Sequence, residues 1–577
     1  MATESTTPPF PTIEDWQHWT LVMGRAQQML MEAWADGLKA GEPLPGVKPS
    51  PAAADPMPWL TASADAWSKG FESWGRMLGA GQKAAEAKDR RFAAPEWREN
   101  PVFDTIRQSY LAISDQLLKS VEQVEGLDEA ARQRLRFATK SFVDAMSPSN
   151  FALTNPQVLK RTMDTRGENL LNGLKHMLED IRSGQMTQTR KGAFEVGKNL
   201  ATTPGKVVKE TELYQLIHYT PVTDTVLTTP LVIFPPWINR FYILDLTPEK
   251  SFVRWCVENG ISLFMVSWKS ADESIAHVSL DDYVLRGQVD AIETVCDLLD
   301  VPSVHAIGYC VAGTTLAATL AYLQAKGEAE KVKSATFFTA QVDFVQAGDL
   351  KLLLGEEVMS LLDKLTEERG VLDGRYMAAT FNLLRGRDLI WNYVVNNYLL
   401  GEEPAPFDLL HWNADVTNLP AGWHKDYLET LYKGNKLAES GGISVAGTPI
   451  DLGTVATPCY VQAGREDHIA PPESVWKIMH HFTGPKRFVL AGSGHIAGVV
   501  NPPSAGKYQY WVNEGDPESL EKFVAGATEH KGSWWPDWLK WLRSQDPTEV
   551  KADGARQPGK GKLKAIEDAP GRYVRTR

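Results

Sequence analysis

The feature that most constrains the fold is an alternation of short apolar runs with helical stretches in the C-terminal two-thirds of the chain. Continuous apolar strands separated by helices are typical of a parallel sheet covered on both faces. The runs are LVIF (231–234), SLFMVS (262–267), SVHAIG (303–308), SATFFTA (334–340), CYVQAG (459–464) and KRFVLAG (486–492). We therefore expect an α/β domain over residues 204–548.

One interval in this alternation is too long for a single connection. More than a hundred residues, helical in pattern and rich in Leu, Trp and Tyr, separate the fourth run from the fifth. A segment of this length indicates an inserted subdomain. An insertion after a central strand would lie over the edge of the sheet where ligands bind. We expect residues 344–450 to form a lid there.

The chain before residue 204 lacks such apolar runs and is helical in pattern. We expect a helical domain over residues 99–203, preceded by a helical extension over residues 1–98 with a proline-rich linker at residues 41–58. Apolar stripes at helical spacing flank that linker. Each stripe alone fits a helix docked on its own domain, whereas the two together favour an apolar surface or partner outside the core. The tryptophans of the extension are Trp16, Trp19, Trp34, Trp59, Trp67 and Trp74.

The 19 tryptophans of the chain are numerous for an otherwise ordinary composition. Three of them, Trp391, Trp412 and Trp423, fall in the expected lid. A further group before the end of the chain predicts core packing of a last helix. That group is Trp534, Trp535, Trp538 and Trp541. Residues 549–577 are basic and lack apolar periodicity, which predicts a solvated, flexible tail.

Composition and short motifs exclude several classes of function. The net charge of −12 argues against non-specific binding to nucleic acid. The four cysteines form no CxxC pair, which favours a reducing compartment and argues against zinc or disulfide scaffolding. No secretory signal and no transmembrane segment are expected. Neither GxxxxGKS nor GxGxxG occurs, so we expect no nucleotide fold of those kinds. We also expect no cofactor and no metal.

The sharpest local feature is a cysteine between an apolar strand and a helix. The strand ends at Gly308, Cys310 follows, and Gly313 opens the helix. This is the layout of a nucleophile elbow, in which small flanking residues allow a strained turn and the helix N-terminus favours a thiolate. Ala312 stands where glycine is usual, which is tolerable if its backbone φ is negative. The alternative is a buried structural cysteine.

Two further side chains follow later strands. Asp467 lies just after the fifth run, and His495 lies in a loop of small residues after the sixth. Each alone could be a turn former or a loop histidine. A nucleophile, an acid and a histidine in this order, each after a strand, match the α/β-hydrolase fold. We therefore expect Cys310, Asp467 and His495 to form a catalytic triad.

An oxyanion hole in such a fold uses the N–H of the residue after the nucleophile and an N–H from the loop after an earlier strand. The first donor is Val311. The loop after LVIF reads PPWINRFYILDL, and because Pro236 has no N–H, Trp237 or Ile238 is the second candidate.

Three other histidines are not expected to act in catalysis. His468 is interpreted as a residue that orders its loop or lines the substrate path. His480 and His481 are adjacent on a helix and lack the spacing of zinc ligands.

Several long segments resemble the polyhydroxyalkanoate synthases, bacterial enzymes that polymerise (R)-3-hydroxyacyl-CoA into storage polyester. The resemblance runs from about residue 100 to the end of the chain. The matching segments are GYCVAGT, GREDHIAPP, SGHIAGVVNPP, NPVFDTIRQSYL, FPPWINRFYILDL, FNLLRGRDLIWNYVVNNYL and FDLLHWNADVTNLP.

The resemblance implies roles for individual residues. Cys310 is the acyl-carrying nucleophile, His495 the base and Asp467 its partner. Trp412 matches a family tryptophan linked to lid and subunit contacts, and Arg385 falls where the family has an arginine near the CoA or product path.

The resemblance also implies partners and a location. The chain looks like the one-subunit class I type that uses short monomers such as 3-hydroxybutyryl-CoA. It implies a homodimer in the cytoplasm at the surface of polyester granules, in contact with the growing chain. A Cys-dependent acyl-CoA thioesterase or polyester depolymerase stays an alternative, and a non-enzymatic granule-coating protein is a more distant one.

Overall fold

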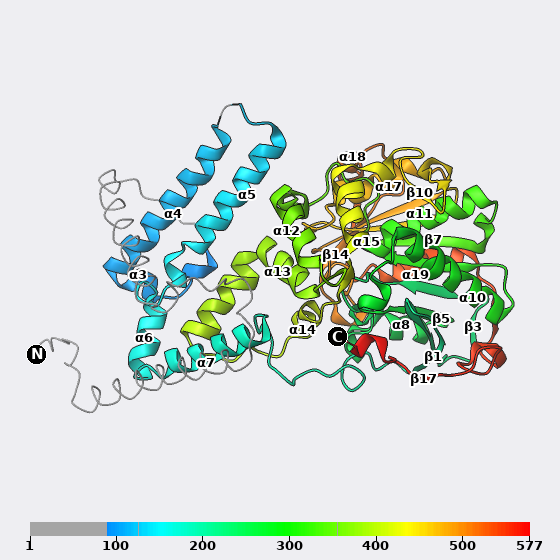
Figure 1. The fold of residues 1–577 in the computed structure, drawn as a ribbon, viewed down its shortest axis with the longest axis horizontal. Helices are drawn as coiled ribbons and strands as arrows, with labels where there is room; N and C mark the ends of the chain where they lie inside the picture. The colour runs from blue at the N-terminus through cyan, green and yellow to red at the C-terminus, as the bar shows by residue number, and fades with distance from the viewer. Residues whose placement is uncertain (1–88, 125, 355, 577) are drawn as a thin grey trace, which may run out of the picture. The chain divides into compact units, whose positions relative to one another are not determined.

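The computed structural model describes the chain from residue 89 to residue 576, apart from residues 125 and 355 (Figure 1). The tryptophan stripes and the proline-rich linker of the sequence lie outside the described residues, and their interpretation stays a prediction. None of the helices in the described part of the chain combines the length and the apolar composition needed to cross a bilayer.

The chain forms two compact units. Among the described residues, one, which we call the helical unit, comprises residues 89–190 and 381–405, and the other, the sheet unit, comprises residues 191–380 and 406–576. The excursion at 381–405 lies inside the segment for which the sequence predicts a lid. That segment therefore contributes to both units, and its action as a lid stays a prediction.

Polar caps start the main helices of the helical unit. Asn100 and Asn155 each accept a backbone N–H at a helix start and are each followed by proline at the first helical position, and Asp128 caps the helix between them. The helical N-terminal domain of the predicted fold is confirmed. Its described elements are η2 (Arg90–Phe92), α3 (Glu96–Glu99), α4 (Pro101–Glu122), α5 (Glu129–Ala145), η3 (Pro148–Asn150), α6 (Pro156–Asp164), α7 (Glu168–Ser183), η10 (Arg387–Trp391) and η11 (Val394–Leu399).

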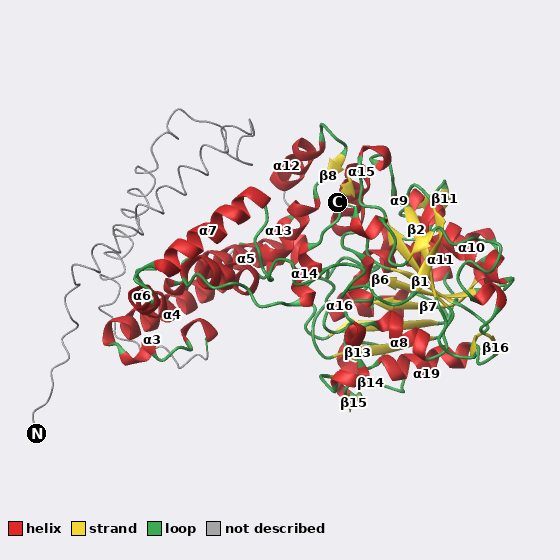
Figure 2. Cartoon of the chain, turned by 90° about the horizontal axis from the view of Figure 1, so that it is seen from below, coloured by secondary structure: helices red, strands yellow, loops and turns green. Residues whose placement is uncertain are grey.

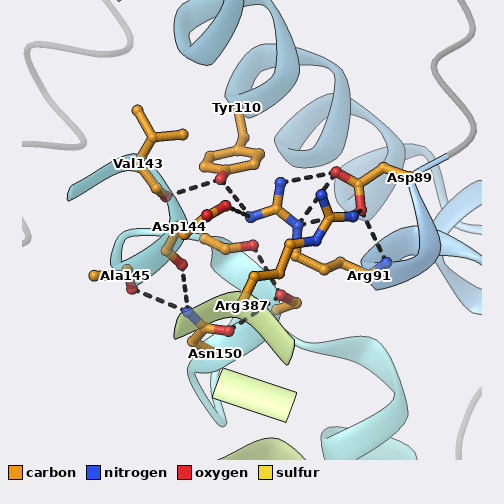
Figure 3. A network of polar contacts seen from close by, with 10 residues as sticks. Asp89, Arg91, Tyr110, Val143, Asp144, Ala145, Asn150 and Arg387 are labelled. Carbon is orange, nitrogen blue, oxygen red and sulfur yellow. Dashed lines mark hydrogen bonds and ion pairs between the residues drawn. The ribbon is translucent and has the colours of Figure 1, made fainter. Parts of the chain in front are cut away.

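A cluster of charged side chains joins the excursion to the rest of the helical unit, and we call it the Arg91 cluster (Figure 3). Arg91 pairs with Asp89 at 2.7 Å and with Asp144 at 3.0 Å, and it donates to the hydroxyl of Tyr110 at 2.8 Å. Arg387 of η10 pairs with Asp89 at 2.6 Å. Together with Tyr110 of α4, the four charged residues therefore connect η2, α4, α5 and the excursion.

The sheet unit is built on a mixed sheet of eleven strands. Its six central strands are parallel to their central neighbours and coincide with the six predicted apolar runs. The antiparallel strands at both edges escape the sequence pattern because polar and charged residues interrupt their apolar runs or, in β15 and β17, replace them entirely. In spatial order the strands are β15 (Thr528–Lys531), β14 (Gln509–Val512), β13 (Lys486–Ala491), β12 (Cys459–Gly464), β7 (Val332–Phe338), β6 (Val304–Tyr309), β4 (Leu231–Phe234), β5 (Leu263–Trp268), β2 (Tyr214–Tyr219), β1 (Gly205–Glu210) and β17 (Glu567–Asp568).

Helices lie on both sides of this sheet (Figure 2). They are α8 (Phe252–Glu258), α9 (Leu280–Asp282), η7 (Tyr283–Val289), α10 (Asp290–Leu299), α11 (Val311–Lys326), α16 (Pro472–Trp476), α17 (Ile478–His481), α18 (Leu520–Ala525) and α19 (Trp535–Gln545). The long interval between β7 and β12 holds α12 (Glu356–Thr366), α13 (Gly374–Leu384), η10, η11, α14 (Asp408–Ala414), α15 (Ala421–Asp426) and η12 (Tyr427–Lys433). The predicted α/β architecture is confirmed.

The predicted core packing of the last helix is also confirmed. Trp534, Trp535 and Trp538 are fully buried. The Nε1 of Trp538 donates to the Oγ1 of Thr336 on β7 at 3.0 Å, and its ring packs on Phe252 of α8. These tryptophans hold α8 and α19 against one face of the sheet.

The prediction of a flexible tail over residues 549–577 is wrong. The tail adds β17 to the edge of the sheet beside β1, and its strand β16 (Glu549–Lys551) pairs with β3 (Thr225–Leu227). Its basic and polar groups bind backbone carbonyls far away in sequence: Arg556 donates to Thr228 at 2.7 Å and Tyr573 to Thr211 at 2.6 Å. Composition cannot predict such long-range partners.

Candidate active site

Cys310 lies in a strained turn between β6 and α11. Its φ of 54° and ψ of −125° are unusual for a residue with a side chain. The turn is fixed on both sides, because the N–H of Cys310 donates to the carbonyl of Phe338 at 2.9 Å and its own carbonyl accepts from Gly313 at 2.9 Å. The side chain is half-buried at the start of the helix.

Two glycines allow the strand and the helix to approach each other. A Cβ atom on Gly308 would lie 2.5 Å from the Cα of Gly313, and one on Gly313 would lie 2.4 Å from the Cβ of Ala340. Ala312 lies within α11, outside the residues with positive φ, so its methyl group causes no backbone strain. The elbow therefore keeps its geometry with alanine at this position.

The loops after β12 and β13 bring Asp467 and His495 together. The Nδ1 of His495 lies 2.7 Å from the Oδ2 of Asp467, whose side chain is fully buried. The other carboxylate oxygen, Oδ1, accepts the N–H groups of Ile469 and Ala470 at 2.9 Å each. Asp467 is thereby fixed as an acceptor that orients the ring.

Cys310 lies close enough to His495 for its side chain to interact with the ring. Burial of the ring disfavours its charged form, yet the charges of Asp467 and Cys310 and its hydrogen bond to Asp467 raise the pKa of His495 well above its usual value. An imidazole in this setting accepts a proton readily. The hydroxyl of Tyr309 donates to the carbonyl of His495 at 3.1 Å and fixes the backbone of its loop.

Sequence reasoning does not identify two tyrosines of η12. Burial is the main cause that raises the pKa values of Tyr427 and Tyr432. The charge of Tyr432 and then that of Cys310 raise the pKa of Tyr427 further, and the charge of Cys310 raises that of Tyr432. Their rings pack edge to face with centroids 5.3 Å apart, and the Nε2 of Gln341 donates to the hydroxyl of Tyr432 at 3.2 Å. The spacing of five between the tyrosines belongs to a π-helix and gives no signal at the α-helical period.

The loop after β4 carries the predicted oxyanion donors Trp237 and Ile238. The ring of Trp237 is buried and stacks on Tyr283 of η7, with centroids 3.9 Å apart. The carbonyl of Trp237 accepts from the hydroxyl of Thr417. Val311, the other predicted donor, is the first residue of α11.

The remaining predicted residues have separate settings. Trp412 is buried in α14, and its Nε1 donates to the carbonyl of Arg240 at 2.6 Å. Arg385 belongs to the helical unit and pairs with Asp388 at 2.8 Å. The carbonyl of His468 accepts the N–H of Asp349 at 3.0 Å, which ties its loop to the start of the long interval.

Comparison with known proteins agrees with this architecture. Residues 88–256 match the model of the poly-beta-hydroxybutyrate polymerase (PhaC) N-terminus, and residues 231–502 match that of the alpha/beta hydrolase fold. Two proteins named poly(3-hydroxyalkanoate) polymerase subunit PhaC are similar. The one from Rhizobium meliloti (strain 1021) is 43% identical over 91% of this chain and 87% of its own. The one from Cupriavidus necator (strain ATCC 17699 / DSM 428 / KCTC 22496 / NCIMB 10442 / H16 / Stanier 337) is 41% identical over 94% and 92%.

A third relative, the poly(3-hydroxyalkanoate) polymerase from Methylorubrum extorquens, is 47% identical over 84% of this chain and 80% of its own. These identities extend over both compact units. The chain therefore belongs to the poly(3-hydroxyalkanoate) polymerase family.

Proposed function

We propose that this chain polymerises (R)-3-hydroxyacyl-CoA, with 3-hydroxybutyryl-CoA as the main substrate, and releases CoA through an acyl-Cys310 intermediate. Membership of the polymerase family supports the overall reaction. The observation that carries the mechanism is the chain of contacts from Asp467 through His495 to Cys310.

In the first step His495 takes the thiol proton and the sulfur of Cys310 attacks the thioester carbonyl. The N–H groups of Val311 and of Trp237 or Ile238 stabilise the resulting oxyanion. The carbon–sulfur bond to CoA then breaks, and the CoA thiolate leaves with the proton held by His495. The acyl group remains on Cys310 as a new thioester.

In the second step the 3-hydroxyl of another acyl group attacks this thioester. His495 takes the hydroxyl proton, the ester bond forms, and the thiolate of Cys310 is released. We assign the base to His495 alone because both oxygens of Asp467 already accept hydrogen bonds. Asp467 orients the ring and stabilises its charged form.

A cysteine suits this chemistry better than a serine. Transfer from CoA to Cys310 exchanges one thioester for another at nearly equal free energy, so the acyl group stays activated for ester formation. A seryl ester would lie lower in free energy and lose that driving force. Buried aromatic residues of the long interval, among them Trp423, Tyr427 and Tyr432, support its role as a lid that excludes water.

Location and assembly follow from the family resemblance alone. We propose a homodimer that works in the cytoplasm at the surface of the polyester granule, with Arg385 on the CoA or product path. Light scattering in the presence and absence of substrate tests the dimer, and a monomer active at the full rate would contradict it.

Cys310→Ala provides the decisive test of the mechanism. Incubation with (R)-3-hydroxybutyryl-CoA should give CoA release and insoluble polymer with the unchanged chain and neither with the variant. Intact mass should show an acyl adduct only when Cys310 is present. The half-buried Cys296 gives a matched control, since Cys296→Ala should retain both products. Free hydroxy acid instead of polymer would support a thioesterase, and CoA release by Cys310→Ala would exclude our mechanism.

A further inference from the structure

Arg240 lies two residues after Ile238, and its side chain is only 1% exposed. Its guanidinium contacts three separate acceptors. Nε lies 3.5 Å from the Oδ1 of Asp415, Nη1 donates to the carbonyl of Tyr573 at 3.2 Å, and Nη2 donates to the carbonyl of Val416 at 3.3 Å. One buried side chain thus joins the loop after β4, the end of α14 and the last residues of the chain.

Residues of the segment 412–417 also hold the backbone of the loop after β4. The Nε1 of Trp412 donates to the carbonyl of Arg240 at 2.6 Å, and Asn239 forms a β-bridge with Val416. Thr417 donates to the carbonyls of both residues that are candidate oxyanion donors. The segment 412–417 therefore lies along the whole loop from residue 237 to residue 240.

We propose that Arg240 is a positioning residue that sets the backbone N–H groups of Trp237 and Ile238 for the oxyanion, and that Asp415 and Tyr573 act on the reaction through it. This inference rests on the proposed function. It gives a chemical role to the tail, which the contact with Tyr573 connects to the loop.

The chemistry of arginine suits this task. A buried ion pair is a weak source of stability, since apolar residues of similar volume often do as well. The planar guanidinium, however, fixes several acceptors at once in a rigid geometry that the single ammonium of lysine does not reproduce. Oxyanion stabilisation depends on donors held at about 2.7–3.1 Å from the developing charge. A displacement of about 1 Å can cost on the order of 100-fold in rate.

The test compares two reactions of Cys310 in the full chain. CoA release from (R)-3-hydroxybutyryl-CoA in a single turnover passes through an oxyanion. Alkylation of Cys310 by iodoacetamide displaces iodide from a saturated carbon and forms none, although both reactions use the thiol and His495. Arg240→Met should lower the rate of CoA release about 10- to 100-fold and leave the alkylation rate, followed by peptide mass, within about twofold.

Arg556 provides the matched control. It is also a buried arginine, and its two terminal nitrogens donate to the carbonyls of Leu227 and Thr228, away from the loop after β4. Arg556→Met should lower thermal stability as Arg240→Met does and leave CoA release unchanged. Arg240→Lys keeps the positive charge but not the planar set of N–H donors, and it should give an intermediate loss in the rate of CoA release.

Equal loss of both reactions in Arg240→Met would overturn the proposal, because it would indicate general damage to the site. So would an unchanged rate of CoA release, or the same kinetic loss in Arg556→Met. If Arg240→Met does not fold, the Arg240→Lys variant decides: an alkylation rate that falls together with CoA release contradicts a positioning role. Failure of the proposed function would show differently, as CoA release that survives Cys310→Ala.

Discussion

The Arg91 cluster and the contacts of Arg240 both join segments that are far apart in sequence, but they do so with different acceptors. Arg91 binds mainly side chains: the carboxylates of Asp89 and Asp144 and the hydroxyl of Tyr110 (Figure 3). Arg240 binds one carboxylate and two backbone carbonyls. Side-chain acceptors can rotate away, whereas backbone carbonyls fix the path of the chain itself.

Burial separates the two regions further. The charged side chains of the Arg91 cluster range from 9% exposed at Asp89 to 39% at Arg387, so water reaches part of the cluster. Arg240 and Asp415 are 1% and 6% exposed. Loss of a partner therefore leaves a buried charge in the sheet unit but a partly hydrated one in the helical unit, and we expect larger effects from the former.

Removal of Asp415 should give the largest effect. Asp415→Ala leaves the guanidinium of Arg240 buried without its carboxylate, which should lower the free energy of unfolding of the sheet unit by about 3–5 kcal/mol. Amide hydrogen exchange of β4 and α14 in the full chain measures this change.

Asp408 offers the control for that variant. It is also buried, but its partner Lys250 is 40% exposed and lies 2.6 Å away. Asp408→Ala leaves a cation that water can solvate, so its cost should be about 1 kcal/mol. Equal costs for the two variants would show that burial of the remaining cation is not the source of the difference.

The same contrast explains what the sequence predicts well. Six strands are predicted because each is a continuous apolar run, and Asp467 and His495 are predicted because each follows one of them. Their meeting with Cys310 then follows from the geometry of parallel strands. Local patterns suffice wherever a residue's role depends on its own strand or helix.

The remaining features depend on contacts between distant segments. Nothing near Arg387 in sequence indicates that it pairs with Asp89, so the sequence predicts that residues 381–405 are simply part of a lid. Nothing near Tyr573 in sequence indicates that its carbonyl accepts a hydrogen bond from Arg240, so the sequence predicts a flexible tail there. Tyr427 and Tyr432 are missed because a π-helix sets their spacing.

Within the Arg91 cluster the two aspartates should respond differently. For Asp89, burial raises the pKa, but the hydrogen bonds and charge of Arg91 and the charge of Arg387 lower it more, so its folded-state pKa lies below its usual value. For Asp144, burial outweighs the attraction of Arg91 and Arg387 and leaves the pKa raised. Ionised Asp89 therefore stabilises the fold at neutral pH, and ionised Asp144 does not.

We expect Asp89→Asn to cost about 1–2 kcal/mol at pH 7 and Asp144→Asn to cost less. The contribution of Asp89 is complete above its unfolded-state pKa of about 3.9 and is lost as the pH falls through its lower folded-state pKa. The two variants should thus converge only when the pH falls below the folded-state pKa of Asp89. Hydrogen exchange of α4 and α5 measures both. A larger cost for Asp144→Asn at pH 7 would contradict this assignment.

The pair between Arg387 and Asp89 should have the smallest effect, although it alone in this cluster reaches the excursion. At 39% exposure, Arg387→Gln should cost about 0.5–1 kcal/mol. Because water reaches the guanidinium, 1 M NaCl should remove most of that cost by screening. Hydrogen exchange across η10 measures it, with Arg385→Gln as control, since Arg385 forms a local ion pair with Asp388, three residues further along the chain. If salt does not reduce the effect of Arg387→Gln, the pair is shielded from water, as the contacts of Arg240 are, and our description of it as solvated is wrong.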